Sequence, residues 1–131
     1  MLFHTFGSQE ERGRFGGSYF IEIQYCRTAL YTERQELVAV DAIEPWKDDS
    51  LYIYGDDDNA FLSYYGEIFT GGIYNNGKSG AVDLCGINYY SPEQTERIVE
   101  RVKRTRPLDH QTLLRWLERA DGYNGFYVLG L

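Results

Sequence analysis

The hydrophobic period of the chain changes within the segment Ile87-Asn88-Tyr89-Tyr90-Ser91-Pro92-Glu93-Gln94 (INYYSPEQ). Before Ser91 the apolar residues mostly follow the patterns of strands, and after it they recur at helical spacing. Ser91 is typical of a helix N-cap, Pro92 of the first helical position, and Gln94 of a capping box. The segment therefore predicts a strand-rich part followed by a helical part.

Five strands are predicted before this segment, each bounded by turn residues. The first is the clearest, because Ile21 and Ile23 alternate with polar residues, which predicts a strand with one buried and one solvated face. Between the last two strands, Asn76-Gly77 supplies the two positive-φ positions of a type I′ hairpin turn. The predicted strands cover residues 18–26, 36–43, 51–54, 60–69 and 81–90.

Two helices and a closing strand are predicted in the second part. The first helix starts at Pro92 and ends near Thr105. The second is capped by Asp109 or Thr105 and ends at Gly122, and the short connection predicts an antiparallel pair. Residues 126–129 (FYVL) predict the closing strand. We therefore expect a single α+β domain over residues 1–131, with a mostly antiparallel sheet of about five to six strands and the helix pair on one face.

The chain is acidic, because 13 Lys and Arg oppose 20 Asp and Glu and give a net charge of −7. Repulsion from phosphates disfavours nucleic acids and anionic membranes as partners and favours a basic partner. No apolar run is long enough for a membrane helix, and the first residues lack the basic region of a signal peptide. Cys26 and Cys85 are predicted to be reduced and buried. We therefore expect a cytoplasmic protein.

The segment Gly72-Ile73-Tyr74-Asn75-Asn76-Gly77-Lys78-Ser79 matches the P-loop pattern G-x-x-x-x-G-K-[ST]. In a P-loop a helix opens at the Lys and directs its N-terminus at the phosphate. Here the residues after Lys78 alternate as in a strand, so a hairpin turn is predicted instead. Nucleotide binding through Gly72–Ser79 is kept as a less favoured alternative.

Other chemical motifs are incomplete. Asp56, Asp58 and Glu67 occupy positions one, three and twelve of a calcium loop, but Phe61 stands where that loop requires Gly. Neither His has a partner at metal-ligand spacing, and no catalytic signature orders a nucleophile with a base. We therefore expect no cofactor, no metal site and no enzymatic activity.

The acidic charge is concentrated in the segment Asp41–Glu67, which holds eight acidic residues and one Lys. In the helical part, the basic cluster of the first helix is predicted to be a solvated face that Glu96 and Glu100 partly neutralise. Tyr and Trp supply rigid contact area and are frequent at binding hot spots. The predicted partner-binding surface consists of Asp41, Glu44, Trp46, Asp48, Asp49, Tyr52, Tyr54, Asp56, Asp57, Asp58, Tyr64, Tyr65 and Glu67.

A small, acidic, Tyr-rich α+β chain with such a segment resembles the immunity proteins of bacterial toxin systems, either contact-dependent or polymorphic. The resemblance implies binding to a cognate toxin domain, often a basic nuclease, whose active site or substrate surface is blocked. It also implies that carboxylates take the place of substrate phosphates and that aromatic rings anchor the contact. The residues implied are Asp48, Asp49, Asp56, Asp57 and Asp58 for the charge, and Trp46, Tyr52 and Tyr54 for the rings.

Two alternatives stay open. One is a small enzyme or ligand-binding domain with a pocket between the sheet and the helix pair, lined by Tyr19, Tyr25, Tyr89 or Tyr90. The other is a subunit of a homo-oligomer or larger complex that pairs through an edge strand such as Phe126–Leu131. A cavity with converging polar groups would favour the first alternative, and a free strand edge would favour the second.

Overall fold

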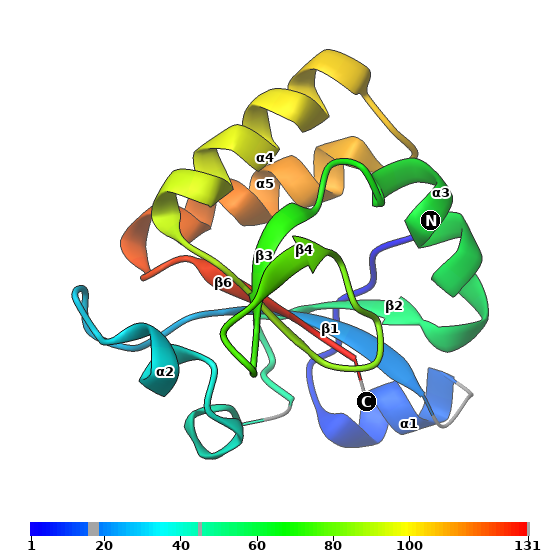
Figure 1. Ribbon diagram of the computed structural model, residues 1–131. Helices are drawn as coiled ribbons and strands as arrows, with labels where there is room; N and C mark the ends of the chain where they lie inside the picture. The colour runs from blue at the N-terminus through cyan, green and yellow to red at the C-terminus, as the bar shows by residue number, and fades with distance from the viewer. Residues whose placement is uncertain (16–18, 45, 131) are drawn as a thin grey trace.

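The centre of the fold is an antiparallel sheet, seen in a computed structural model that describes residues 1–15, 19–44 and 46–130. Six strands of these residues lie in the order β2-β1-β6-β5-β3-β4 (Figure 1). The predicted α+β class and its antiparallel sheet are therefore confirmed. The strands are β1 (Phe20–Tyr25), β2 (Leu51–Tyr54), β3 (Thr70–Tyr74), β4 (Ser79–Ala81), β5 (Ile87–Tyr90) and β6 (Phe126–Leu129).

Helices cover both faces of the sheet. The antiparallel pair α4 and α5 lies with α3 on one face, as predicted for the pair, and α1 and α2 lie on the other (Figure 1). The helical elements are α1 (Gln9–Phe15), α2 (Arg34–Leu37), η1 (Val40–Ala42), η2 (Gly55–Asp57), α3 (Asp58–Tyr65), α4 (Pro92–Thr105), α5 (His110–Arg119) and η3 (Ala120–Gly122), where η denotes a 3-10 turn.

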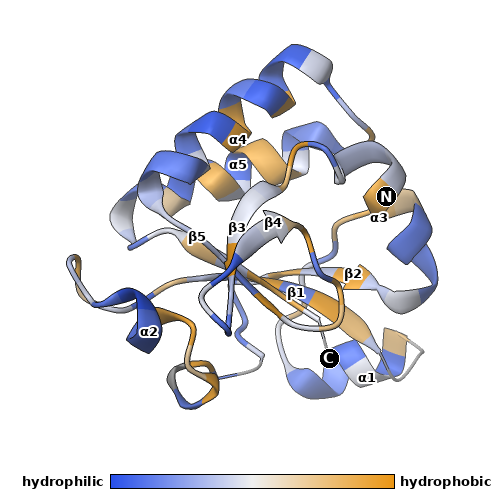
Figure 2. Cartoon of the chain, viewed as in Figure 1, coloured by the Kyte–Doolittle hydropathy of each residue, from blue (hydrophilic) through white to orange (hydrophobic). Residues whose placement is uncertain are grey.

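The main core lies between the sheet and α3, α4 and α5. Ile21 and Ile23 of β1 point into it and join Phe61, Ile98 and Leu113 from the three helices, all of them 0% exposed. Burying each such side chain contributes about 1.5–3 kcal/mol. Figure 2 shows apolar residues along the strands and hydrophilic residues on the outer surface of α4. Apolar burial therefore holds the helix pair against the sheet.

The opposite face of the sheet is covered as well, so every residue of β1 is buried. Phe20 and Tyr52 pack with Phe6 beside α1, and Leu37 of α2 covers the neighbouring strands. Glu22 faces this second layer and is 4% exposed. The polar alternation of β1 thus marks a second buried layer, and the strand is not half-solvated as its sequence predicted.

Two predicted strands are helical, which corrects their assignment. Residues 36–43 contain the end of α2 and all of η1, and residues 60–69 contain most of α3. In α3 the buried side chains are Phe61 and Tyr65, four residues apart, as in a helix that faces a core. Residues 81–90 contain the last residue of β4, a loop at 82–86 and all of β5, so the predicted strand forms only in part. Cys85 lies in this loop and is exposed, so its predicted burial is wrong, whereas Cys26 is buried.

The hairpin between β3 and β4 also differs from its prediction. Gly77 has a φ of +84°, but Asn76 does not have a positive φ, so the turn is not type I′. The N–H of Gly77 donates to Tyr74 O at 2.9 Å, and the N–H of Tyr74 donates to Lys78 O at 2.7 Å. These bonds define a type I turn followed by a Gly bulge. Because a strand follows Lys78, this segment lacks the helix of a P-loop.

The helices α4 and α5 begin in different ways. Ser91 caps α4 as predicted, because its Oγ accepts a 3.2 Å hydrogen bond from the N–H of Gln94. Asp109 precedes α5 with a φ of +62°, but its side chain makes no cap bond. Its carboxylate accepts the backbone N–H groups of Leu2 and Phe3 instead, at 3.0 and 2.9 Å. The predicted cap is therefore an anchor for the first residues of the chain.

The closing strand lies inside the sheet. β6 pairs with β1 on one side and β5 on the other, which corrects the prediction that Phe126–Leu131 offers an edge. Leu131 itself falls outside the described residues. The outer side of β2 is bridged by His4, whose backbone N–H and C=O both bond to Tyr52 at 2.8 Å. The other edge strand, β4, has three residues, so neither edge resembles a long template for pairing.

Candidate protein-binding surface

Two rings that were predicted to contact a partner are core residues. Tyr52 and Tyr65 are 0% exposed. The hydroxyl of Tyr52 donates to Lys47 O at 2.7 Å, and that of Tyr65 donates to Leu108 O at 2.6 Å. Burial raises the pKa of both hydroxyls above their usual range. Because neither ring reaches the surface, both are removed from the predicted contact surface.

The other predicted rings differ in exposure. Trp46 and Tyr54 are half-buried against the aromatic cluster around Phe20. The neighbouring Asp56 carboxylate raises the pKa of the Tyr54 hydroxyl. Tyr64 is 48% exposed and so is the predicted ring with the most free surface.

The acidic residues of the segment Asp41–Glu67 lie in separate places. Asp41 belongs to η1, just after α2, whereas Asp56 and Asp57 belong to η2, just before α3. Figure 1 shows α2 and α3 on opposite sides of the molecule. The structure therefore divides the predicted acidic surface into parts.

Two acidic residues of this segment have basic partners. Lys47 Nζ donates to the Glu44 carboxylate and thereby lowers the pKa of Glu44. The Arg27 guanidinium forms an ion pair with Asp49. The predicted carboxylates that form no ion pair within the described residues are Asp41, Asp48, Asp56, Asp57, Asp58 and Glu67.

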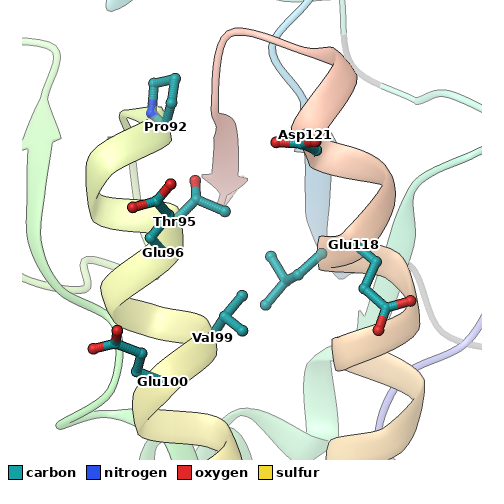
Figure 3. Close-up of a pocket in the computed structure, with 8 residues that line it drawn as sticks. Pro92, Thr95, Glu96, Val99, Glu100, Glu118 and Asp121 are labelled. Carbon is teal, nitrogen blue, oxygen red and sulfur yellow. The ribbon is translucent and has the colours of Figure 1, made fainter.

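A groove between α4 and α5 gathers acidic residues that were not part of the predicted partner-binding surface (Figure 3). Its volume is about 430 Å³. Figure 3 shows Thr95 and Val99 between the two helices, with Glu100 and Glu118 on the outer flanks and Asp121 near one end. The groove is lined by Pro92, Thr95, Glu96, Val99, Glu100, Leu117, Glu118 and Asp121.

The groove has an apolar floor and an acidic rim. No cation lines it, and its four carboxylates are Glu96, Glu100, Glu118 and Asp121. None of them takes part in an ion pair among the residues that the structure describes. The sequence predicted that arginines of the same helix would neutralise Glu96 and Glu100, but Arg101 donates to Ile68 O at 2.9 Å instead. The rim therefore presents carboxylates that form no ion pair within the described residues, beside apolar surface.

The net charge of the helical part gives no sign of this acidic groove, because residues 91–131 hold seven basic and six acidic residues. On a helical wheel of α4 the glutamates separate from the arginines, whereas Lys103 falls among the glutamates. Glu96 and Glu100 lie nearer to Val99, and the arginines lie between Glu100 and Ile98. This segregation is the sequence signal that would have found the acidic rim. The basic stripe consists of Arg97, Arg101 and Arg104.

A second hollow adjoins the groove, because Pro92 and Asp121 line both. Its volume is about 500 Å³, and it reaches Leu30 in the loop between β1 and α2. Leu30 is 61% exposed, and the next residue, Tyr31, is 98% exposed with a φ of +70°. Asn124 Nδ2 donates to a backbone oxygen of this loop at 3.0 Å, so the loop is fastened to the body. An acidic groove and an exposed aromatic tip therefore adjoin.

Tyr25, Tyr89 and Tyr90 do not form the predicted pocket between the sheet and the helix pair. Tyr25, Tyr89 and Tyr90 are buried, and their hydroxyls donate to backbone oxygens at 2.7, 2.8 and 3.1 Å. Tyr25 and Tyr90 belong to the main core, whereas Tyr89 belongs to the second layer. Burial raises the pKa of all three hydroxyls. These tyrosines therefore stabilise the two layers and do not converge on one cavity.

Two features of other protein classes are absent from the described residues. None of their helices combines the length and apolar character needed to cross a membrane. No group of three or more His, Cys, Asp or Glu among them is placed to hold a metal ion. Comparison with protein-family models, curated proteins and solved structures found no match for the chain. The α4–α5 groove and its surroundings are the observations from which a function can be argued.

Proposed function

We propose that the chain is a protein-binding module that recognises a basic protein through the groove between α4 and α5. The observation that carries the proposal is the acidic rim, whose carboxylates have no ion-pair partner within the described residues. Like charges beside apolar surface repel one another more strongly than they would in bulk water. Lys or Arg side chains from a partner would replace this repulsion with charge-assisted hydrogen bonds.

We infer that the basic partner is a toxin domain and that the chain acts as its immunity protein. A nuclease surface carries Lys and Arg that bind phosphates, and carboxylates satisfy the same groups. A protein seated on that surface excludes the nucleic acid sterically and by charge. The net charge of −7 and the acidic groove support a partner of this kind.

Carboxylates outside the groove support the same proposal in a second way. Asp41, Asp48 and Asp56 are exposed and do not line the groove. Exposed charge at a distance contributes little to the strength of a contact but raises the rate of encounter with a basic partner. We therefore assign these predicted residues to steering and the groove to contact.

The experiment is co-expression of the chain with the product of the neighbouring gene. Growth reports protection, and calorimetry on the purified pair reports affinity at low and high salt. We expect protection and tight binding for the wild type, and about 100-fold weaker, less salt-sensitive binding for the double variant Glu96→Lys with Glu118→Lys. The matched control is Glu33→Lys with Glu36→Lys, an equal charge change at exposed positions near α2. Equal affinity of the two double variants would contradict the proposal.

A further inference from the structure

We propose that the element of the partner that occupies the α4–α5 groove is a basic amphipathic α-helix, and that the loop tip Leu30-Tyr31 contacts the same element. This inference rests on the proposed function and adds the shape and residue pattern of the partner. It also adds a second contact, because Leu30 and Tyr31 stand outside the acidic rim.

The shape of the groove fits the side chains of a helix. Its lining positions on α4 run from Pro92 to Glu100 and follow one helical face, a length of about 12 Å. A volume of about 430 Å³ receives a few large side chains and is too small for a whole folded element. A third helix laid along α4 and α5 would insert side chains spaced at i, i+3, i+4 and i+7.

The chemistry of the groove specifies which side chains those are. Val99 and Leu117 form an apolar floor, so the inserted residues are apolar. The α4 flank carries Glu96 and Glu100, and the α5 side carries acidic residues as well, so cations are favoured on both sides of the apolar stripe. The occupant is thus a helix with an apolar stripe flanked by Lys or Arg.

An extended strand fits this surface poorly. The backbone groups within α4 and α5 bond inside their own helices, and no strand edge borders the groove in the described residues. A strand added there would leave its own N–H and C=O groups without partners against the apolar floor. A helix satisfies its backbone internally and presents only side chains, so it is the compatible element.

The loop tip extends the contact beyond the groove. The hollow that shares Pro92 and Asp121 with the groove leads to Leu30, and Tyr31 follows at the tip. Tyr31 is 98% exposed at a φ of +70°, a conformation that is uncommon for a bulky residue. An exposed Tyr offers aromatic contact area, and Tyr is enriched at binding hot spots. The loop is therefore placed to contact a helix that leaves the groove at the Pro92 end.

The test uses two synthetic probe peptides of about 14 residues with the same Lys, Leu and Ala composition. In one peptide Leu recurs at i, i+3, i+4 and i+7 with Lys on both flanks, and in the other Leu and Lys alternate as in a strand. Fluorescence anisotropy at low salt gives their affinities, and circular dichroism gives their helix content on binding. We expect the helical peptide to bind about tenfold tighter or better and to gain helix. Equal binding of the two peptides would overturn the inference.

Variants locate the contact. Glu96→Lys with Glu118→Lys should abolish the preference for the helical peptide, and Tyr31→Ala should weaken its binding about fivefold. Glu33→Lys with Glu36→Lys is the control and should leave the preference intact. If the toxin pair responds to the groove variant while the helical peptide shows no preference, the helical occupant is wrong and the proposed function stands. If neither the pair nor the peptides respond to it, both fail.

Discussion

The backbone N–H of Trp46 donates a 2.7 Å hydrogen bond to Glu22 Oε1, which ties the loop before β2 to the middle of β1. Trp46 has a φ of +75°, so this bond holds a conformation that a bulky residue rarely adopts. Glu22 Oε2 accepts further bonds from the N–H of Lys47 at 3.0 Å and the hydroxyl of Ser50 at 2.7 Å. A buried carboxylate therefore organises this loop through donors and not through an ion pair.

Replacing Glu22 with Gln should lower the free energy of unfolding by about 2–4 kcal/mol. The amide keeps the shape of the side chain, but it replaces one accepting oxygen with an NH2 group that faces the same donors. It also removes the negative charge that strengthens these bonds. Urea unfolding measures the change. Glu118→Gln is the control, because Glu118 is exposed and should change stability by less than about 0.5 kcal/mol. Similar midpoints for the two variants would show that the Glu22 carboxylate is not required.

Acid should weaken the fold through Asp109. Burial alone would raise the pKa of this carboxyl, but bonds from Phe3 N–H, the Thr112 hydroxyl and Leu2 N–H hold it below its usual 3.8. The ionised form is therefore favoured in the folded state, and its contribution is complete well above 3.8 and lost as the pH falls below it. The difference in unfolding free energy between wild type and Asp109→Asn should be about 1–2 kcal/mol at neutral pH and shrink in acid. A difference that stays constant with pH would argue against this role.

Base should unfold the chain cooperatively. Burial raises the pKa of the core hydroxyls, which include those of Tyr65, Tyr90 and Tyr127. The neutral form is thus favoured in the folded state, so this stability is present below pH 10.0, the ordinary tyrosine pKa, and is lost as the pH rises beyond it. Tyrosinate absorbance and circular dichroism, followed together in a pH titration, should show that buried rings ionise as structure is lost. Complete ionisation with the fold intact would contradict the burial.

Replacing Gly125 and Gly13 with Ala should change the stability of the fold in opposite directions. Gly125 has a φ of +79°, and a Cβ there would stand 2.0 Å from Tyr90 O, so Gly125→Ala should cost about 2 kcal/mol or more. Gly13 lies within α1, and a Cβ there meets nothing within 4 Å. Gly13→Ala should therefore raise stability by about 0.5–1 kcal/mol. Thermal unfolding of the two variants checks the contrast, and a drop in melting temperature for Gly13→Ala would refute the second half.

Tyr31→Gly should separate stability from binding. Gly adopts a φ of +70° without strain, and the ring makes little contact at 98% exposure, so the melting temperature should hold or rise. Affinity for the basic probe peptide should fall about fivefold, because the aromatic contact is lost. A residue whose removal improves the fold and weakens binding is the expected mark of a functional position. Lower stability with unchanged affinity would assign Tyr31 a structural role instead.

Local patterns predicted much of the fold but not its layers. The strand around Ile21 and the start of α4 at Ser91 were predicted correctly, because strict alternation and a cap are local signals. Residues 36–43 and 60–69 carry short apolar runs that fit either period, and tertiary contact determines which one forms. The side chain of Phe61 is buried in a helix only because the sheet lies beneath it.

The candidate site was harder to predict for a spatial reason. Glu96 and Glu118 lie 22 positions apart and line the same groove only after α4 and α5 have paired. Conversely, the neighbours Tyr64 and Tyr65 look alike in sequence but differ in burial, since one is 48% and the other 0% exposed. Charge summed along the chain therefore located a different acidic surface from the one that the helices assemble.

The position of β6 has a consequence for how the molecule folds. This strand is the last of the six in sequence, yet it alone connects the β2–β1 pair to the β5–β3–β4 group. Until residues 126–129 dock, β1 and β5 each expose the edge at which β6 pairs in the folded sheet. Contacts so distant in sequence slow folding, and exposed strand edges favour aggregation. We therefore expect slow, cooperative folding in which β6 pairs with β1 and β5 in the same step.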